Sequence, residues 1–327
     1  MRIRCGSLRS ASFARGAVAC TIGNFDGVHR GHQAMLALLK NEARHRNLPA
    51  CVLTFEPHPR DHFAALAGKP ESAPARISTL RDKLTELQRC GIDEVVVARF
   101  NQRFASLSAQ AFITDVLQHS LHARYVLVGD DFSFGAKRAG NYALLDAAGA
   151  AAGFDVARMM SYEVHGLRVS SSAVRQALAS GDMAHAADLL GRTYSVSGRV
   201  ARGRQLGREL GFRTLNLRFG HPRPAASGIF VVRVHGLSAA PVAGVASLGV
   251  RPTVEDSGRV LLETHCLQWP ADLGAEAGYG RCIRVDLLHK LHDELKYDTL
   301  QALRDGIARD TQAAALWHAQ QPSIAPL

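Results

Sequence analysis

Two histidines three residues apart, His29 and His32, stand in a glycine-bearing stretch whose residue types suit phosphate binding. This stretch, TIGNFDGVHRGHQ from Thr21, follows an apolar run and leads into a segment with helical spacing. Backbone N–H groups at a helix N-terminus favour anionic oxygens, and glycines let the backbone approach a ligand closely. Residues three apart share a helix face. The two histidines, with Gly23, Asn24, Phe25, Asp26 and Gly27, are therefore a candidate phosphate site.

A structural role and a zinc site both compete with phosphate binding for this histidine pair. Two histidines on a helix are often only structural. A zinc site is possible too, although no CxxC, HExxH or compact Cys/His cluster supplies further ligands. The sequence also has no GxxxxGK[ST] loop, which excludes a P-loop enzyme. The spacing alone leaves a phosphate site and a structural role open.

The composition is that of a folded protein with two domains. The chain has 327 residues and 47% hydrophobic content, enough for packed cores. A net charge of +10 suits anionic partners, and both nucleotides and RNA are possible. Six scattered cysteines without framework spacing are expected to be reduced, which favours the cytoplasm. No uncharged apolar run is long enough to span a membrane.

The elements that must position these residues alternate in type over the first half of the chain. Short apolar runs predict strands at 17–22, 50–55, 94–98, 125–128 and 156–160, and helical spacing predicts helices at 80–90, 109–121 and 141–152. In the helix after His29, we expect Met35, Leu38 and Leu39 on one apolar face. Strands separated by helices predict a doubly wound parallel sheet. Its ligands bind beyond the carboxyl ends of the strands.

The pattern changes after residue 191. Short β-branched runs separated by turns predict strands at 194–200, 229–234, 242–247, 260–267 and 283–288, followed by a helix from about residue 298. These runs predict a small antiparallel β-barrel domain with a C-terminal helix. We place the two domains at residues 1–188 and 189–327. The arginine-rich N-terminus lacks the apolar core of a signal peptide and is interpreted as a lead-in to the first strand.

Three further motifs in the first half lead to a known family. LTFEPHPR starts at Leu53, VGDDFSFGAKRAGN at Val128 and VSSSAVRQAL at Val169. With the His29 segment, they resemble the FMN adenylyltransferase half of the bacterial bifunctional riboflavin kinase/FAD synthetases. The resemblance implies that His29 and His32 bind the triphosphate and the transition state, and that Arg175 with Ser170, Ser171 and Ser172 neutralises the departing phosphates. It also implies that Asp131 serves Mg²⁺, ATP or the flavin, and that Phe55, His58 and Pro59 border the flavin phosphate.

The second half resembles the riboflavin kinase part of the same family. GRVARGRQLGRELGFRTLNL from Gly198 is similar to its glycine-rich ATP loop, and GVASLGVRPTV and LETHCLQW match two later motifs. The resemblance implies phosphate contacts from Gly203, Gly207 and Gly211, and Mg²⁺ with ATP at Thr214 and Asn216. It implies Glu263 as general base and Arg251, His292 and Glu294 as flavin-binding residues. Two residues depart from the family pattern: Arg213 replaces a proline, and His292 replaces an arginine.

The resemblance covers about residues 17–315 and implies two reactions. Riboflavin and ATP give FMN, and FMN with a second ATP gives FAD and pyrophosphate. Both steps imply Mg²⁺, with no nucleic-acid or membrane partner and a monomer or weak homo-oligomer. One alternative is an FMN adenylyltransferase whose kinase domain has decayed into a flavin-binding module. A non-catalytic RNA-binding regulator is the other.

Overall fold

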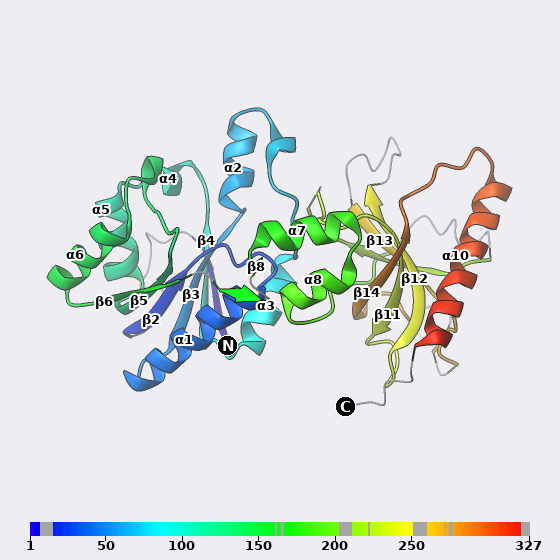
Figure 1. The fold of residues 1–327 in the computed structure, drawn as a ribbon, viewed down its shortest axis with the longest axis horizontal. Helices are drawn as coiled ribbons and strands as arrows, with labels where there is room; N and C mark the ends of the chain where they lie inside the picture. The colour runs from blue at the N-terminus through cyan, green and yellow to red at the C-terminus, as the bar shows by residue number, and fades with distance from the viewer. Residues whose placement is uncertain are drawn as a thin grey trace. The chain divides into compact units, whose positions relative to one another are not determined.

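The computed structural model describes residues 1–6, 16–160, 162–164, 167–202, 211–221, 223–250, 260–271, 273–274 and 277–321. The chain forms two compact units (Figure 1). The first comprises Met1–Pro74 and Lys83–Ser170, and the second comprises Ala75–Asp82 and Ser171–Leu327.

The first unit contains a six-stranded parallel sheet. Its order is β1-β4-β3-β2-β5-β6, with β1 at Arg2–Gly6, β2 at Val18–Ile22, β3 at Ala50–Glu56, β4 at Glu94–Arg99, β5 at Ala123–Gly129 and β6 at Asp155–Met159. The predicted parallel sheet is confirmed, and its five predicted strands begin and end within two residues of the observed ones. The strand β1, which pairs with the edge of β4, was not predicted.

Burial explains why these strands form. Every residue of β2 is buried, as are the first six of β3, which is the pattern of a parallel sheet covered on both faces. Cys20 and Cys51 lie side by side in this core, and burial raises the pKa of the Cys20 thiol to about 12. All six cysteines are free thiols.

The strand order reverses between β2 and β5. Connections lead from β2 to β3 and β4 on one side and from β5 to β6 on the other. Right-handed crossovers place the helices between β2 and β4 on one face of the sheet and the helices after β4 on the other face. The helices after β4 pack with Val18, Cys20 and Ile22 in one hydrophobic core. Ligands of doubly wound sheets bind at such a switch point, beyond the strand ends. The loops after β2 and β5 lie there.

The helical segments of this unit are α1 (Arg30–His45), α2 (Pro59–Leu66), η1 (Pro70–Ser72), α4 (Gln102–Ala105), α5 (Ala109–Ala111), η2 (Phe112–Ser120), η3 (Ala136–Arg138), α6 (Tyr142–Ala152) and α3 (Leu80–Arg89) from Lys83 onward. The short strands β7 (Glu163–Val164) and β8 (Leu167–Arg168) pair antiparallel. The helix predicted at 109–121 is one α turn followed by the π-helical η2. The predicted face of α1 is wrong in part, because Leu36, Leu39 and Ala43 are its buried residues and Leu38 is 47% exposed.

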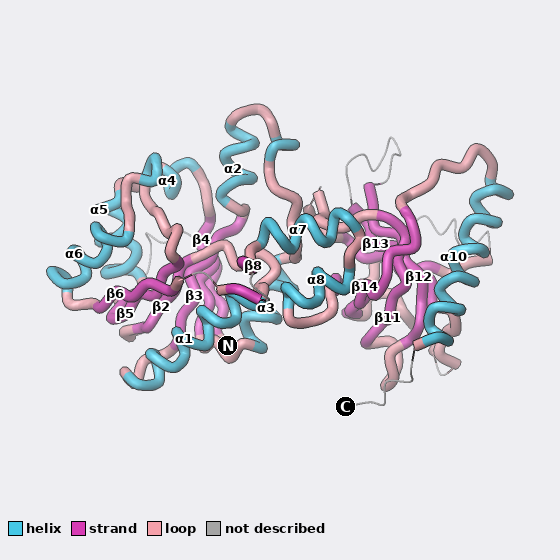
Figure 2. Tube along the Cα trace, in the orientation of Figure 1, coloured by secondary structure: helices cyan, strands magenta, loops and turns pink. Residues whose placement is uncertain are grey.

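The second unit contains the antiparallel barrel. Its order is β10-β13-β12-β11-β14-β9, with β9 at Ser195–Arg199, β10 at Thr214–Arg218, β11 at Gly228–His235, β12 at Val242–Val250, β13 at Val260–Cys266 and β14 at Cys282–His292. A bridge between Ala201 and Asn216 nearly closes it. The helix α10 (Leu300–Gln320) lies along β11 and β12 (Figure 2). The barrel and its C-terminal helix are confirmed, whereas β10 was interpreted as part of a loop.

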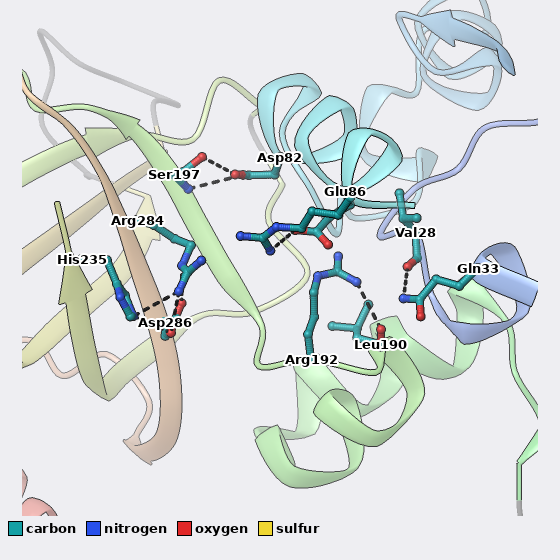
Figure 3. Close-up of polar contacts among 11 residues, drawn as sticks. Val28, Gln33, Asp82, Glu86, Leu190, Arg192, Ser197, His235, Arg284 and Asp286 are labelled. Carbon is teal, nitrogen blue, oxygen red and sulfur yellow. Dashed lines mark hydrogen bonds and ion pairs between the residues drawn. The ribbon is translucent and has the colours of Figure 1, made fainter. Parts of the chain in front are cut away.

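Residues from the first half of the sequence belong to this unit. Arg76 exchanges backbone hydrogen bonds with Arg223 and Ala225. The carboxylate of Asp82 accepts a hydrogen bond from the hydroxyl group of Ser197 (Figure 3). It accepts another from the hydroxyl group of Thr79. Burial raises the pKa of Asp82, and these hydrogen bonds oppose the shift. The helices α7 (Ser171–Ser180) and α8 (Met183–Leu190) also lie in the second unit, and α8 packs on β14.

None of the helices that the structure describes is long and apolar enough to cross a lipid bilayer.

Candidate active sites

The loop after β2 is held in an unusual backbone conformation. Phe25 has φ of +48° and Val28 has φ of +41°, in the left-handed region that disfavours residues with a side chain. The Phe25 ring is buried and lies 4.9 Å from the His32 ring. A Cβ at Gly23 would come within 3.1 Å of the Phe25 ring. Gly23 therefore leaves room for the ring of Phe25, which packs against its own loop.

His29 and His32 begin α1, as predicted. His29 is the N-cap, and its Nδ1 accepts the backbone N–H of His32 at 3.3 Å. The two rings are stacked, with centroids 3.6 Å apart. Because Nδ1 accepts a hydrogen bond, the proton of the neutral His29 ring is on Nε2. A Cβ at Gly31 would lie 3.3 Å from the His29 ring and from the carbonyl of Val169, so a glycine leaves room for the imidazole.

The other predicted residues of the first unit occupy different surroundings. Asp131 follows β5, its side chain is 81% exposed, and Arg168 lies 3.7 Å from its carboxylate. Phe55 packs in the core against Phe100. His58 caps α2 by accepting the N–H of Arg60, and Pro59 is the first residue of that helix. Phe55, His58 and Pro59 thus each have a structural role, and their place beside the flavin phosphate stays a prediction.

The serine and arginine motif starts α7. Ser170 ends the first unit, and Ser171 and Ser172 open the helix. Arg175 lies one turn further on, and its Nε donates to the carbonyl of Ala75 at 2.6 Å.

In the barrel, several of the residues predicted for the second site lie in one row. Asn216 is directly opposite Glu263, and Glu263 is directly opposite Ser247. Opposed residues of antiparallel strands project from the same face. Asn216 is 5% exposed, and among the described residues nothing donates to its Oδ1. The row continues to Glu294, whose carboxylate accepts the Ser247 hydroxyl at 2.9 Å.

Thr214 shares this face with Asn216, two residues away on β10. The residue before it, Arg213, is fixed at both ends. Its guanidinium lies 3.7 Å above the Trp269 ring, and its carbonyl accepts a hydrogen bond from Nδ1 of His265 at 2.8 Å. His265 is itself opposite Thr214.

His292 links the barrel to α10. Its Nε2 lies 2.9 Å from Asp310 and its Nδ1 lies 2.6 Å from the carbonyl of Asp293. Burial lowers the pKa of His292, but these hydrogen bonds and the nearby carboxylates outweigh burial, and the pKa is raised.

Three predicted residues, Gly203, Gly207 and Arg251, lie outside the described residues. Gly211 is described, with φ of +88°. Within the described ranges, no group of three or more His, Cys, Asp or Glu side chains could hold a metal ion, so the zinc interpretation of His29 and His32 gains no further ligands.

Two buried polar residues behind the histidine loop were not predicted as functional. They are Lys83 on α3 and Thr54 on β3. A signal existed, because Lys83 falls three residues after Leu80 and four before Leu87, on the apolar stripe of its helix.

Comparison with protein families gives a match for each half of the chain. Residues 12–173 match the family model described as FAD synthetase, and residues 190–318 match the one described as riboflavin kinase.

Curated relatives match across both halves. Proteins named bifunctional riboflavin kinase/FMN adenylyltransferase are 46% identical in Escherichia coli K12, over 90% of both chains, and 43% identical in Pseudomonas fluorescens, over 92% of both. A solved structure described as a macrolide-efflux protein from Streptococcus pneumoniae is 25% identical, with a TM-score of 0.75 over 97% of this chain and 100% of that one.

Proposed function

The chain belongs to the bifunctional riboflavin kinase/FMN adenylyltransferases, and we propose how its residues divide the two reactions. It phosphorylates riboflavin with ATP to FMN and then adenylylates FMN with ATP to FAD, releasing pyrophosphate. We assign FAD synthesis to residues 1–188 and the kinase to residues 189–327, in keeping with the ranges of the two family matches.

In the second reaction, the phosphate of FMN attacks the α-phosphorus of ATP, so an anion approaches an anion. Positioning and electrostatic stabilisation suffice for this step, without a protein nucleophile. His29 and His32 bind the triphosphate and the transition state at the start of α1. Their stacked rings, 3.6 Å apart at a helix N-terminus, support this role. Arg175 and the serines before it stabilise the departing pyrophosphate, and Asp131 serves ATP or the flavin.

In the first reaction, Glu263 orients the 5′-hydroxyl of riboflavin and takes its proton as the phosphoryl group arrives. Its place directly opposite Asn216 is the observation that carries this proposal.

The oxygens of Thr214 and Asn216 fit Mg²⁺ bound to ATP, since that ion prefers oxygen ligands. The buried Oδ1 of Asn216, for which no described residue is a donor, supports the fit. When bound, the ion would neutralise part of the negative charge of the phosphates. In this proposal, Glu294 and His292 bind the flavin.

We further propose a cytoplasmic enzyme, a monomer or weak homo-oligomer, with no nucleic-acid or membrane partner. The positive charge of +10 is then matched by its substrates, since riboflavin phosphates and ATP are all anionic.

The test incubates pure protein with riboflavin, ATP and Mg²⁺ and separates FMN from FAD. The native chain forms both products. Glu263→Gln lowers FMN formation by at least about a hundredfold and leaves FMN-to-FAD conversion intact. The matched control is Glu71→Gln, at an exposed glutamate in the first unit. Equal loss of both activities in Glu263→Gln, or an unchanged kinase, contradicts the proposal. FAD from added FMN but none from riboflavin in the native chain favours the adenylyltransferase-only alternative.

A further inference from the structure

A lysine is buried behind the loop that carries the strained residues Phe25 and Val28. Lys83 on α3 is 1% exposed, and its Nζ lies 3.4 Å from the hydroxyl of Thr54. Thr54 on β3 is fully buried. A buried ammonium group is costly unless it is hydrogen-bonded, so the position of this lysine needs a reason.

Thr54 connects the lysine to the loop. Its hydroxyl donates to the carbonyl of Asn24 at 3.2 Å. A hydroxyl has one proton, and an ammonium group can only donate. Because Lys83 donates to the Thr54 oxygen, the Thr54 proton is directed to Asn24.

The direction of this carbonyl sets the direction of the next N–H. The peptide unit is planar and trans, so the N–H of Phe25 points to the side opposite the Asn24 carbonyl. With the carbonyl held toward Thr54, this N–H is turned away from β3. The far end of the loop is held too, because Gln33 on α1 donates from Nε2 to the carbonyl of Val28 at 2.8 Å (Figure 3).

We infer that Lys83 and Thr54 are positioning residues for adenylyl transfer. Acting through Asn24, they hold the loop from Gly23 to Val28 in the strained conformation that places the N–H of Phe25 and the side chain of His29 for the triphosphate. Strained backbone persists only where its surroundings determine it, and this hydrogen-bonded chain is one such determinant. The inference rests on the proposed role of the loop in FAD synthesis.

The test compares Thr54→Val, Lys83→Met and the double variant, with Thr54→Ser as the rescue. Thr21→Val is the matched control, since Thr21 is a fully buried threonine of the adjacent strand whose hydroxyl contacts Met35 rather than the loop. For each variant, kcat and the KM for ATP are measured for FMN-to-FAD conversion. Riboflavin kinase activity and thermal unfolding report on the fold.

Thr54→Val and Lys83→Met should each lower kcat/KM for FAD formation about tenfold, the effect of one lost hydrogen bond in a buried site. The double variant should lose little more than Thr54→Val, because Lys83 acts through Thr54. Thr54→Ser and Thr21→Val should stay near the native values, and kinase activity should be unchanged throughout.

The inference is overturned if Thr54→Val retains native kcat and KM, if Thr21→Val costs as much as Thr54→Val, or if the losses add fully. His32→Ala separates it from the proposed function. If His32→Ala loses FAD formation while Thr54→Val keeps native activity, only the inference about Thr54 and Lys83 is overturned. If both variants keep native FAD-forming activity, the proposed role of the loop is overturned.

Discussion

The guanidinium of Arg213 lies 3.7 Å above the ring of Trp269, at the position where the family pattern has a proline. Proline fixes φ before Thr214 without help from other residues. Here, contacts with other residues fix the backbone before Thr214. Arg213 stacks on an indole whose Nε1 donates to the carbonyl of Leu273 at 3.0 Å, and its own carbonyl accepts a hydrogen bond from His265. A cation–π stack thus stands where the family uses a rigid ring.

The first prediction is that Trp269 matters only while residue 213 is arginine. Arg213→Ala and Trp269→Leu should each raise the KM for ATP in FMN formation about threefold to tenfold, as expected for the loss of a partly buried cation–π stack. Arg213→Pro should restore the native KM, and Trp269→Leu should then have little effect. Steady-state kinetics of the four variants decide this. If Arg213→Pro is as impaired as Arg213→Ala, the guanidinium itself contacts phosphate and the positioning role is wrong.

The second prediction separates the two reactions through His32. His32→Ala should lower FAD formation from FMN at least about a hundredfold, because it removes a charge-stabilising group at the reacting phosphates. FMN formation should persist, since this histidine belongs to the first unit. His45→Ala, at the exposed far end of the same helix, is the matched control. Unchanged FAD synthesis in His32→Ala would sink the assignment.

The sequence predicted most of the sheet because β2, β3 and β4 are buried apolar runs. It missed strands that lack this signal. β1 alternates charged and apolar residues at a sheet edge, and β10 carries Thr214 and Asn216, whose polar side chains suggested a loop. The local hydrophobic pattern of a sequence detects strands that are buried. The strands β1 and β10 form because they pair with β4 and β13.

Motifs in the sequence single out the candidate site residues His29, Asn216 and Glu263, whose roles stay predictions. The contacts that hold them were not predictable, because they join residues far apart in sequence. Lys83 and Thr54 are 29 residues apart, and Arg213 and His265 are 52 apart. Only the tertiary fold brings such pairs together, and no local periodicity encodes them.

The third prediction concerns Gly249, which leaves space for Glu294. A Cβ at this position would collide with both carboxylate oxygens of Glu294. Gly249→Ala should therefore displace Glu294 from Ser247 and raise the KM for riboflavin about tenfold, with FMN-to-FAD conversion unaffected. Gly274→Ala, where a Cβ meets open space, is the control. A native riboflavin KM in Gly249→Ala would show that Glu294 does not serve the flavin.

The fourth prediction is that the hydrogen bond between His292 of the barrel and Asp310 of α10 stabilises the fold in a pH-dependent way. Burial lowers the pKa of His292, but its hydrogen bonds to Asp310 and to the carbonyl of Asp293 outweigh burial, so the folded pKa is raised above 6.5. The folded state then binds this proton more tightly than the unfolded state. The stabilisation is fully present below pH 6.5, the unfolded pKa, and is lost as the pH rises through the folded pKa.

Asp310→Asn should therefore lower the melting temperature more at about pH 6 than at about pH 9, by about 1–3 °C. Asp305→Asn is the matched control, because Asp305 is an exposed acid of the same helix that accepts from Gln301 rather than from a histidine. Thermal unfolding followed by circular dichroism measures both variants across this range. An equal loss at the two pH values would mean that the histidine is neutral in the folded state and that Asp310 acts only as a hydrogen-bond acceptor. A loss that grows with pH would reverse the sign of the linkage and contradict the raised pKa.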